Sequence, residues 1–129
     1  TRAPQWTGGG VVFAPVPRDY TFKMNKKEKR LALKSALTSR VQENKLVVLD
    51  ELKFDGIKTK NMKAVLDALN VKKALIVLNE NDQNVVLSAR NLADVRTVLT
   101  NTINVFDILK YNTVVVTKAA VETIEEVYA

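Results

Sequence analysis

Cysteine and histidine are both missing from the 129-residue sequence. Without cysteine the chain can form neither disulfide bonds nor thiolate metal sites, and this composition fits a reducing compartment. Without histidine it lacks the commonest general base and the commonest metal ligand, which excludes Ser-His-Asp and Cys-His catalysis. No apolar stretch approaches the roughly 20 residues that cross a bilayer, and the start shows no signal-peptide pattern. We therefore expect no transmembrane span and neither kind of catalytic site.

Glycine and proline are scarce and unevenly placed. The sequence holds four Gly and three Pro, and all of them except Gly56 lie within residues 1–24. Clustered glycine and proline residues are typical of irregular structure, so residues 1–24 are expected to form an extended arm. Residues 25–129 are expected to form one α/β globular domain, long enough to bury a core.

Short apolar runs recur after residue 45. They are "LVVLDEL" (46–52), "ALIVLNE" (74–80), "TVVVTK" (113–118) and a weaker "VRTVL" (95–99). Unbroken runs of this kind indicate strands covered on both faces, as in parallel sheets. Helical patterns flank them, with candidate caps at Asn25, Thr59, Asp82, Asn104 and Thr117. The alternation predicts the α/β class: an open, mostly parallel sheet flanked by helices, Rossmann-like and three-layered, with an extended N-terminal arm.

The helical periodicity also predicts which side chains are buried. The first helix, extending to about Asn44 with Asn25 and Glu28 as a capping box, is expected to bury Leu33, Ala36, Leu37 and Val41. The second is expected to bury Met62, Val65, Leu66 and Leu69, and the last Val121, Ile124 and Val127.

Positive charge is concentrated at the start of the chain. Of the net charge of +6, residues 1–34 contribute eight cations and two anions, while residues 35–129 hold twelve of each sign. The run "KKEKR" (26–30) places four cations at the positive end of a helix dipole, where each costs about 0.3–1 kcal/mol. A polyanionic partner would explain this arrangement, and nucleic acid is the partner favoured. The alternative is an ordinary solvated surface.

Three consecutive glycines, Gly8, Gly9 and Gly10, follow the only tryptophan, Trp6. They would let the backbone lie close to a sugar-phosphate surface, while Trp6 stacks on an unpaired base. Alternatively, the glycines form a flexible linker and Trp6 packs at the edge of the core. Neither a dinucleotide-binding nor a phosphate-loop motif is present.

A rival site is predicted at the carboxyl ends of the strands, where open α/β sheets bind ligands. Its candidate residues are Asp50, Glu51, Asn79, Glu80, Asp82 and Lys118. Carboxylates facing a lysine are similar to the magnesium and phosphate site of a receiver-like α/β domain. The alternative is that these are ordinary turn and helix-cap residues.

The segment "RAPQWTGGGVVFAPVPRDYTFKMNKKEKRLALKSALTSR" (2–40) resembles the universal L-four family, the fourth protein of the large ribosomal subunit, in its bacterial form. Later pieces, "LVVLDEL", "KTKNM", "SARNL" and "NVFDILKY", agree with the family. The resemblance covers the whole chain and corresponds to the C-terminal two-thirds of such a protein. Thr7 stands where the family commonly has Arg, and Ala14 where it commonly has Gly.

The resemblance implies a structural constituent of the large ribosomal subunit, located in the cytoplasm within the ribosome. Such a protein is a primary binder of rRNA and helps assembly, and its long basic loop, mostly absent from these residues, reaches the peptide exit tunnel. The implied partners are large-subunit rRNA, neighbouring ribosomal proteins and, in some bacterial members that repress their own operon, the leader of their own messenger. No catalytic residue, metal, cofactor, DNA or membrane partner is implied.

Carried over by position, the RNA-binding residues fall into two groups. The returning limb of the loop would contribute Arg2, Gln5, Trp6, Gly8, Gly9 and Gly10. The rRNA-facing side of the body would contribute Arg18, Lys23, Lys26, Lys27, Lys29, Arg30 and Lys34.

Overall fold

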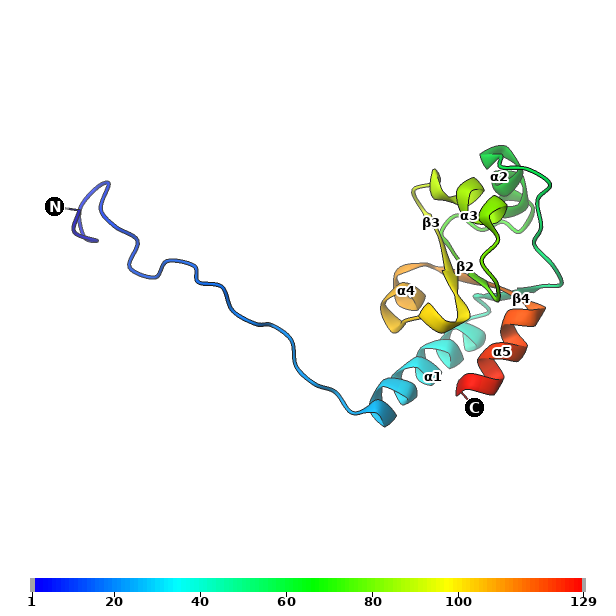
Figure 1. Ribbon diagram of the computed structural model, residues 1–129, viewed down its shortest axis with the longest axis horizontal. Helices are drawn as coiled ribbons and strands as arrows, with labels where there is room; N and C mark the ends of the chain where they lie inside the picture. The colour runs from blue at the N-terminus through cyan, green and yellow to red at the C-terminus, as the bar shows by residue number, and fades with distance from the viewer. Residues whose placement is uncertain (1, 129) are drawn as a thin grey trace.

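The computed structural model describes residues 2–128, and residues 26–128 form alternating helices and strands. The elements are α1 (Lys26–Gln42), β1 (Leu46–Leu49), α2 (Thr59–Ala68), β2 (Ala74–Leu78), α3 (Gln83–Arg90), β3 (Val95–Leu99), the 3-10 turn η1 (Thr100–Thr102), α4 (Val105–Lys110), β4 (Thr113–Thr117) and α5 (Lys118–Tyr128). Residues 2–25 contain no helix or strand and extend far from the rest (Figure 1). None of the described helices is long and apolar enough to cross a membrane.

The strands of residues 2–128 form one parallel sheet in the order β1-β4-β2-β3. The central strand β2 is buried along its whole length, as its unbroken apolar run predicts. Helices cover both faces of this sheet (Figure 1). The predicted α/β class, with an open parallel sheet in a three-layer arrangement, is confirmed.

Alternate residues of each strand point to opposite faces and so divide the core in two. On one face, Leu75 and Val77 of β2 pack in a cluster with side chains of α1, α4 and α5. On the other face, Ala74, Ile76 and Leu78 pack with side chains of α2 and α3. Each helix therefore buries one side on the sheet, which is why its apolar residues follow a helical period.

The edge strand β1 departs from the prediction that its apolar run is covered on both faces. Within residues 2–128 it pairs with β4 alone, and Val48 is 52% exposed. The prediction of complete burial was therefore wrong for β1, because an apolar run does not distinguish a central strand from an edge strand.

Helix α1 also buries a different residue from the one predicted. Leu33 and Ala36 lie in the core as expected, but Val41 is 57% exposed and Arg40 only 7% exposed. Arg40 completes the i, i+3, i+4, i+7 stripe and donates from Nε to the Ile108 carbonyl oxygen (3.0 Å). Its Nη2 donates to the Leu109 carbonyl oxygen (3.1 Å), so the guanidinium satisfies two carbonyl groups near the C-terminal end of α4.

The other predicted helix faces are largely confirmed. Met62 and Leu66 are buried in α2, and Val65 and Leu69 are partly buried. In α5, Val121 and Ile124 pack against the core, but Val127 is 55% exposed, so its predicted burial was wrong. Tyr128 packs against the core near the end of this helix.

Three of the predicted helix caps can be compared with the structure in detail. The Asp82 carboxylate accepts from the Asn84 N–H (2.9 Å), and the Asn104 side chain accepts from the Asp107 N–H (2.8 Å), so both caps are confirmed. Thr59 is the first residue of α2 and Lys58 holds the cap position, so the prediction for Thr59 was wrong.

Helices α1 and α2 both end on an asparagine in the left-handed conformation. Asn44 has φ 54° and Asn70 has φ 55°. Beyond them, the Lys45 N–H donates to the Arg40 carbonyl (2.9 Å) and the Val71 N–H to the Leu66 carbonyl (3.0 Å). These are Schellman motifs, and they end α1 at Gln42, two residues before the predicted end.

Candidate nucleic-acid interface

The first group of predicted RNA-binding residues lies in a closed turn at the far end of the arm. The Gly10 N–H donates to the Arg2 carbonyl (2.9 Å), and two further backbone hydrogen bonds join Trp6 to Ala3 (3.0 Å) and Gly9 to Trp6 (2.9 Å). Trp6 is 55% exposed. The structure thus brings together Arg2, Gln5, Trp6, Gly8, Gly9 and Gly10, and these residues form neither a flat strip nor part of the core.

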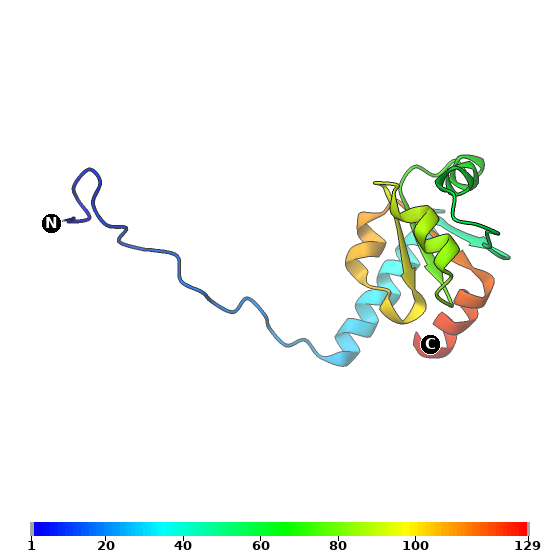
Figure 2. The same cartoon turned by 45° about the horizontal axis from the view of Figure 1, so that its top comes forward.

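Five residues of the second group lie at the other end of the arm, on the first turns of α1, whereas Arg18 and Lys23 lie in the arm just before this helix. Figures 1 and 2 show the first turns of α1 projecting beyond the sheet and its other helices. Apart from Leu33, every residue from 11 to 35 is exposed. The structure therefore brings together Lys26, Lys27, Lys29, Arg30 and Lys34, but holds them far from the turn at residues 2–10.

None of these cations is neutralised by a neighbouring side chain. The five salt bridges found among residues 2–128 involve Arg40, Lys45, Lys53, Lys73 and Arg96, all beyond residue 34. The one acid in the first turn, Glu28, instead accepts from the Asn25 N–H (3.3 Å) and thereby forms one half of the expected capping box. The start of α1 is therefore a positive surface with the helix dipole behind it.

The arm itself is not uniformly basic. Residues 3–17 contain no charged side chain, and positive charge resumes at Arg18. The Arg18 guanidinium lies over the Tyr20 ring, 4.3 Å from its centroid. Next to it, the Asp19 carboxylate accepts from the Thr21 hydroxyl (2.6 Å) and the Thr21 N–H (2.9 Å), which lowers the pKa of Asp19. Residues 18–21 thus contain both a cation–π pair and a local hydrogen-bonded turn.

Two aromatic residues were missed as candidates by the sequence analysis. Tyr20 is 76% exposed and Phe22 is 82% exposed, and both lie between Arg18 and Lys23. Exposed aromatic rings among cations are typical of surfaces on which unpaired bases stack. The signal was present in the sequence "RDYTFK", where aromatic residues alternate with polar ones.

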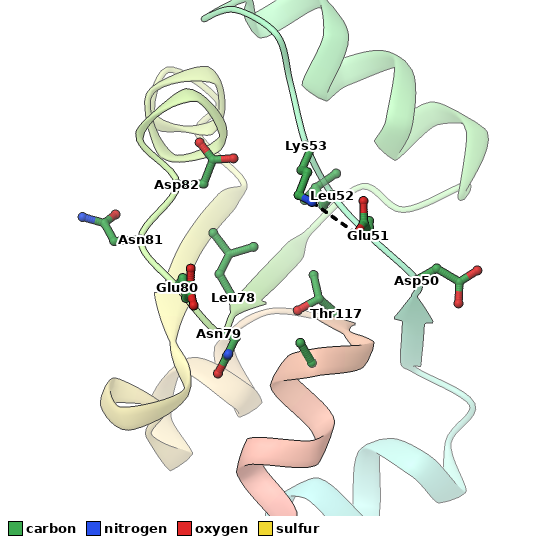
Figure 3. Close-up of a pocket in the computed structure, with 11 residues that line it drawn as sticks. Asp50, Glu51, Leu52, Lys53, Leu78, Asn79, Glu80, Asn81, Asp82 and Thr117 are labelled. Carbon is green, nitrogen blue, oxygen red and sulfur yellow. Dashed lines mark hydrogen bonds and ion pairs between the residues drawn. The ribbon is translucent and has the colours of Figure 1, made fainter.

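The rival site at the strand ends exists as a cavity of about 430 Å³. Its carboxylates do not converge: Figure 3 shows Asp50 and Asp82 on opposite sides. Glu51 pairs with Lys53 (3.2 Å), and Asp82 caps α3. Within residues 2–128 no three acidic side chains are grouped to hold a metal ion, and Lys118 does not line the cavity. This geometry gives the receiver-like alternative no support and fits turn and cap residues.

Comparison with known sequences places the chain among ribosomal proteins. Residues 1–127 match the family described as Ribosomal protein L4/L1 family. The chain is 72% identical over its full length to a protein of Agathobacter rectalis and 67% identical to one of Lachnoclostridium phytofermentans. Both relatives are named large ribosomal subunit protein uL4, and the chain spans 63% of the length of each. By this match and these identities, the chain belongs to the ribosomal protein L4/L1 family.

Proposed function

We propose that this chain is the rRNA-binding portion of a structural protein of the large ribosomal subunit, working in the cytoplasm within the ribosome. The names of the relatives support the subunit. The chain spans 63% of the length of each relative, and no role in lining the exit tunnel is proposed for its residues. The proposed role is binding and scaffolding, without a catalytic site or a cofactor.

The observation that carries this proposal is the exposed, unpaired positive charge at residues 18–34. Seven cations and two anions lie there, and none of the salt bridges of residues 2–128 uses them. A folded domain gains nothing from repelling charges at a helix N-terminus. A phosphate backbone docked on the same turns would be held by the cations, the dipole and the free N–H groups together.

We infer that the molecule has two parts with different tasks. The proposed boundary lies between residues 24 and 25, with the arm before it and the body, which carries the sheet, after it. The extended residues 11–25 span at most roughly 50 Å at about 3.3–3.6 Å per residue. The two groups of candidate residues would therefore bind RNA at two separated places. One place is the turn at residues 2–10, and the other is the start of α1.

Further partners follow from the same role. Neighbouring ribosomal proteins would contact the exposed apolar side chains of the arm, such as Val12 and Phe13. The leader of the protein's own messenger would compete with rRNA for the cations of α1. DNA and membranes are not proposed as partners.

A salt-titrated binding experiment tests the proposal. For rRNA, log affinity should fall linearly with log salt, by about 0.7–0.9 for each phosphate engaged. Changing Lys26, Lys27, Lys29 and Arg30 to Gln should flatten that slope by about 2.8–3.6. Raising the salt from 50 to 200 mM should therefore weaken the binding of the variant by a factor that is about 50- to 150-fold smaller than the factor for the unmodified chain.

The matched control removes four exposed cations from the body, Lys58, Lys60, Lys63 and Lys72, none of which forms a salt bridge within residues 2–128. This control should leave the slope within about one unit of the unmodified chain. Equal slopes for the two quadruple variants would show that net charge alone drives binding, and would overturn the proposed surface.

A further inference from the structure

The turn at residues 2–10 has a defined backbone although it contains three glycines and lies far from the body (Figures 1 and 2). Its closing hydrogen bond joins Gly10 to Arg2 (2.9 Å), and the two inner bonds join Trp6 to Ala3 (3.0 Å) and Gly9 to Trp6 (2.9 Å). These local bonds, not packing against the sheet, define its shape. A flexible linker would leave its backbone groups to water, so the turn is a folded element.

The three glycines have different importance for this turn. A Cβ at Gly9 would collide with the Ala3 carbonyl oxygen and lie 2.8 Å from the Trp6 carbonyl oxygen. Gly8 has φ +73°, a conformation that side chains disfavour, although it has open space around it. A Cβ at Gly10 would lie 3.4 Å from the Arg2 carbonyl oxygen, which is an ordinary contact. Steric closure of the turn therefore depends on Gly9 above all.

The closed turn fixes what the arm offers to a ligand. Trp6 is held within the turn by its N–H and its carbonyl, and its side chain remains 55% exposed. Within residues 2–128 the N–H groups of Thr7 and Gly8 donate to no other protein atom. An exposed indole beside two free N–H donors suits an unpaired base and its phosphate. Arg2 is the only charged side chain described in the turn.

We propose that this turn is the specificity-determining element of the RNA interface and that Gly9 is its positioning residue. The inference rests on the proposed rRNA-binding function. The cations of α1 supply salt-dependent affinity for any RNA, because phosphates are the same in every sequence. The turn reads a folded RNA with an unpaired base, and because its shape exists before binding, it gives up little conformational entropy in the complex.

Comparing Gly9→Ala with Gly10→Ala in the full chain tests this division of tasks. The probes are a large-subunit rRNA transcript and a scrambled RNA of the same length and composition. Gly9→Ala should lower the preference for rRNA over scrambled RNA at least tenfold and leave the salt slope unchanged. Gly10→Ala should change both quantities less than twofold. In the free protein, amide exchange at Gly10 should become faster only in Gly9→Ala.

The outcomes separate this inference from the function on which it rests. If Gly9→Ala keeps the preference for rRNA, or weakens both RNAs equally, the turn is not the specificity element. If the unmodified chain shows neither a preference nor a steep salt slope, the rRNA-binding function fails and this inference fails with it. Thermal unfolding of the body should be the same in all three proteins, because the turn lies far from it.

Discussion

The N-terminal segment, residues 2–34, and the part of the body that follows it, residues 35–128, use the same kinds of side chain in opposite ways. In residues 35–128, apolar residues pack against each other on both faces of the sheet, and the charges balance. In the N-terminal segment, Phe13 is 93% exposed, Phe22 is 82% exposed, and cations outnumber anions. The body is organised by its own interior, whereas the N-terminal segment presents surface that only another molecule can cover.

The largest expected effect tests this comparison by removing apolar side chains from both regions. Leu75→Ala in the buried centre of β2 should lower the free energy of unfolding by about 2–5 kcal/mol. Phe13→Ala removes a larger side chain from the arm, yet it should change that free energy by less than about 0.5 kcal/mol. Urea unfolding of both variants measures the difference. A comparable loss from Phe13→Ala would mean that the arm packs on the body in solution.

A second prediction concerns Arg40, which connects the C-terminal part of α1 to α4. Arg40 lies beyond the cations of α1 and bonds the carbonyl oxygens of Ile108 and Leu109, so Arg40→Leu should destabilise the body by about 2–3 kcal/mol. The matched control is Arg90→Leu, at an exposed position in the last turn of α3. Chemical unfolding should separate these two variants clearly. If both lose the same stability, the buried bonds of Arg40 contribute nothing beyond a surface charge.

The sequence predicted the positions of the strands in the body better than it predicted which side chains on the edge strand β1 and on helix α1 are buried. Unbroken apolar runs located β1, β2 and β4, and the weaker run "VRTVL" located β3. The prediction is best for β2, because a central strand of a parallel sheet is covered on both faces. The exposure of Val48 and the burial of Arg40 were missed, since each depends on neighbours distant in the chain: a sheet edge in one case and the end of α4 in the other.

For the candidate site, charge counting selected the start of α1, which the structure leaves exposed and unpaired. The glycine run was selected as an RNA-binding candidate, which stays a prediction, but its closed turn was not predicted. That turn depends on a bond between Arg2 and Gly10 that no local pattern specifies. Tyr20 and Phe22 were not predicted, because positive charge identified the candidates around them and charge does not identify an aromatic ring.

A third prediction uses those two aromatic residues. Tyr20→Leu and Phe22→Leu should each weaken rRNA binding by about 1–3 kcal/mol if bases stack on their rings. The salt slope should stay the same, because no phosphate contact is lost. Phe106→Leu is the control, since Phe106 lies in the body, is 67% exposed and also has a cation near its ring, Lys110 Nζ at 5.5 Å from the centroid. An equal effect of Phe106→Leu would remove the distinction between the two regions as RNA-binding surfaces.

The smallest expected effect distinguishes the two regions by their response to acid. The Lys45 ammonium (2.7 Å) and then the Ser39 hydroxyl (3.1 Å) bond the Glu43 carboxylate and hold its pKa below the ordinary value of 4.5. A carboxyl with a lowered pKa in the folded state stabilises the fold above the unfolded value, and this contribution is lost as the pH falls through the folded value. Glu43→Gln should therefore flatten the dependence of stability on pH below about 4.5.

Hydrogen bonds to Thr21 lower the pKa of Asp19 in the arm as well. Those bonds join only residues 19 and 21 of the arm, which does not pack on the sheet. We therefore expect unfolding of the body to leave the pKa of Asp19 unchanged. Asp19→Asn should thus leave the pH dependence of unfolding unaltered, as followed by circular dichroism from pH 7 to pH 3. A slope changed by Asp19→Asn would show that arm and body unfold as one unit, against the separation on which the two binding places depend.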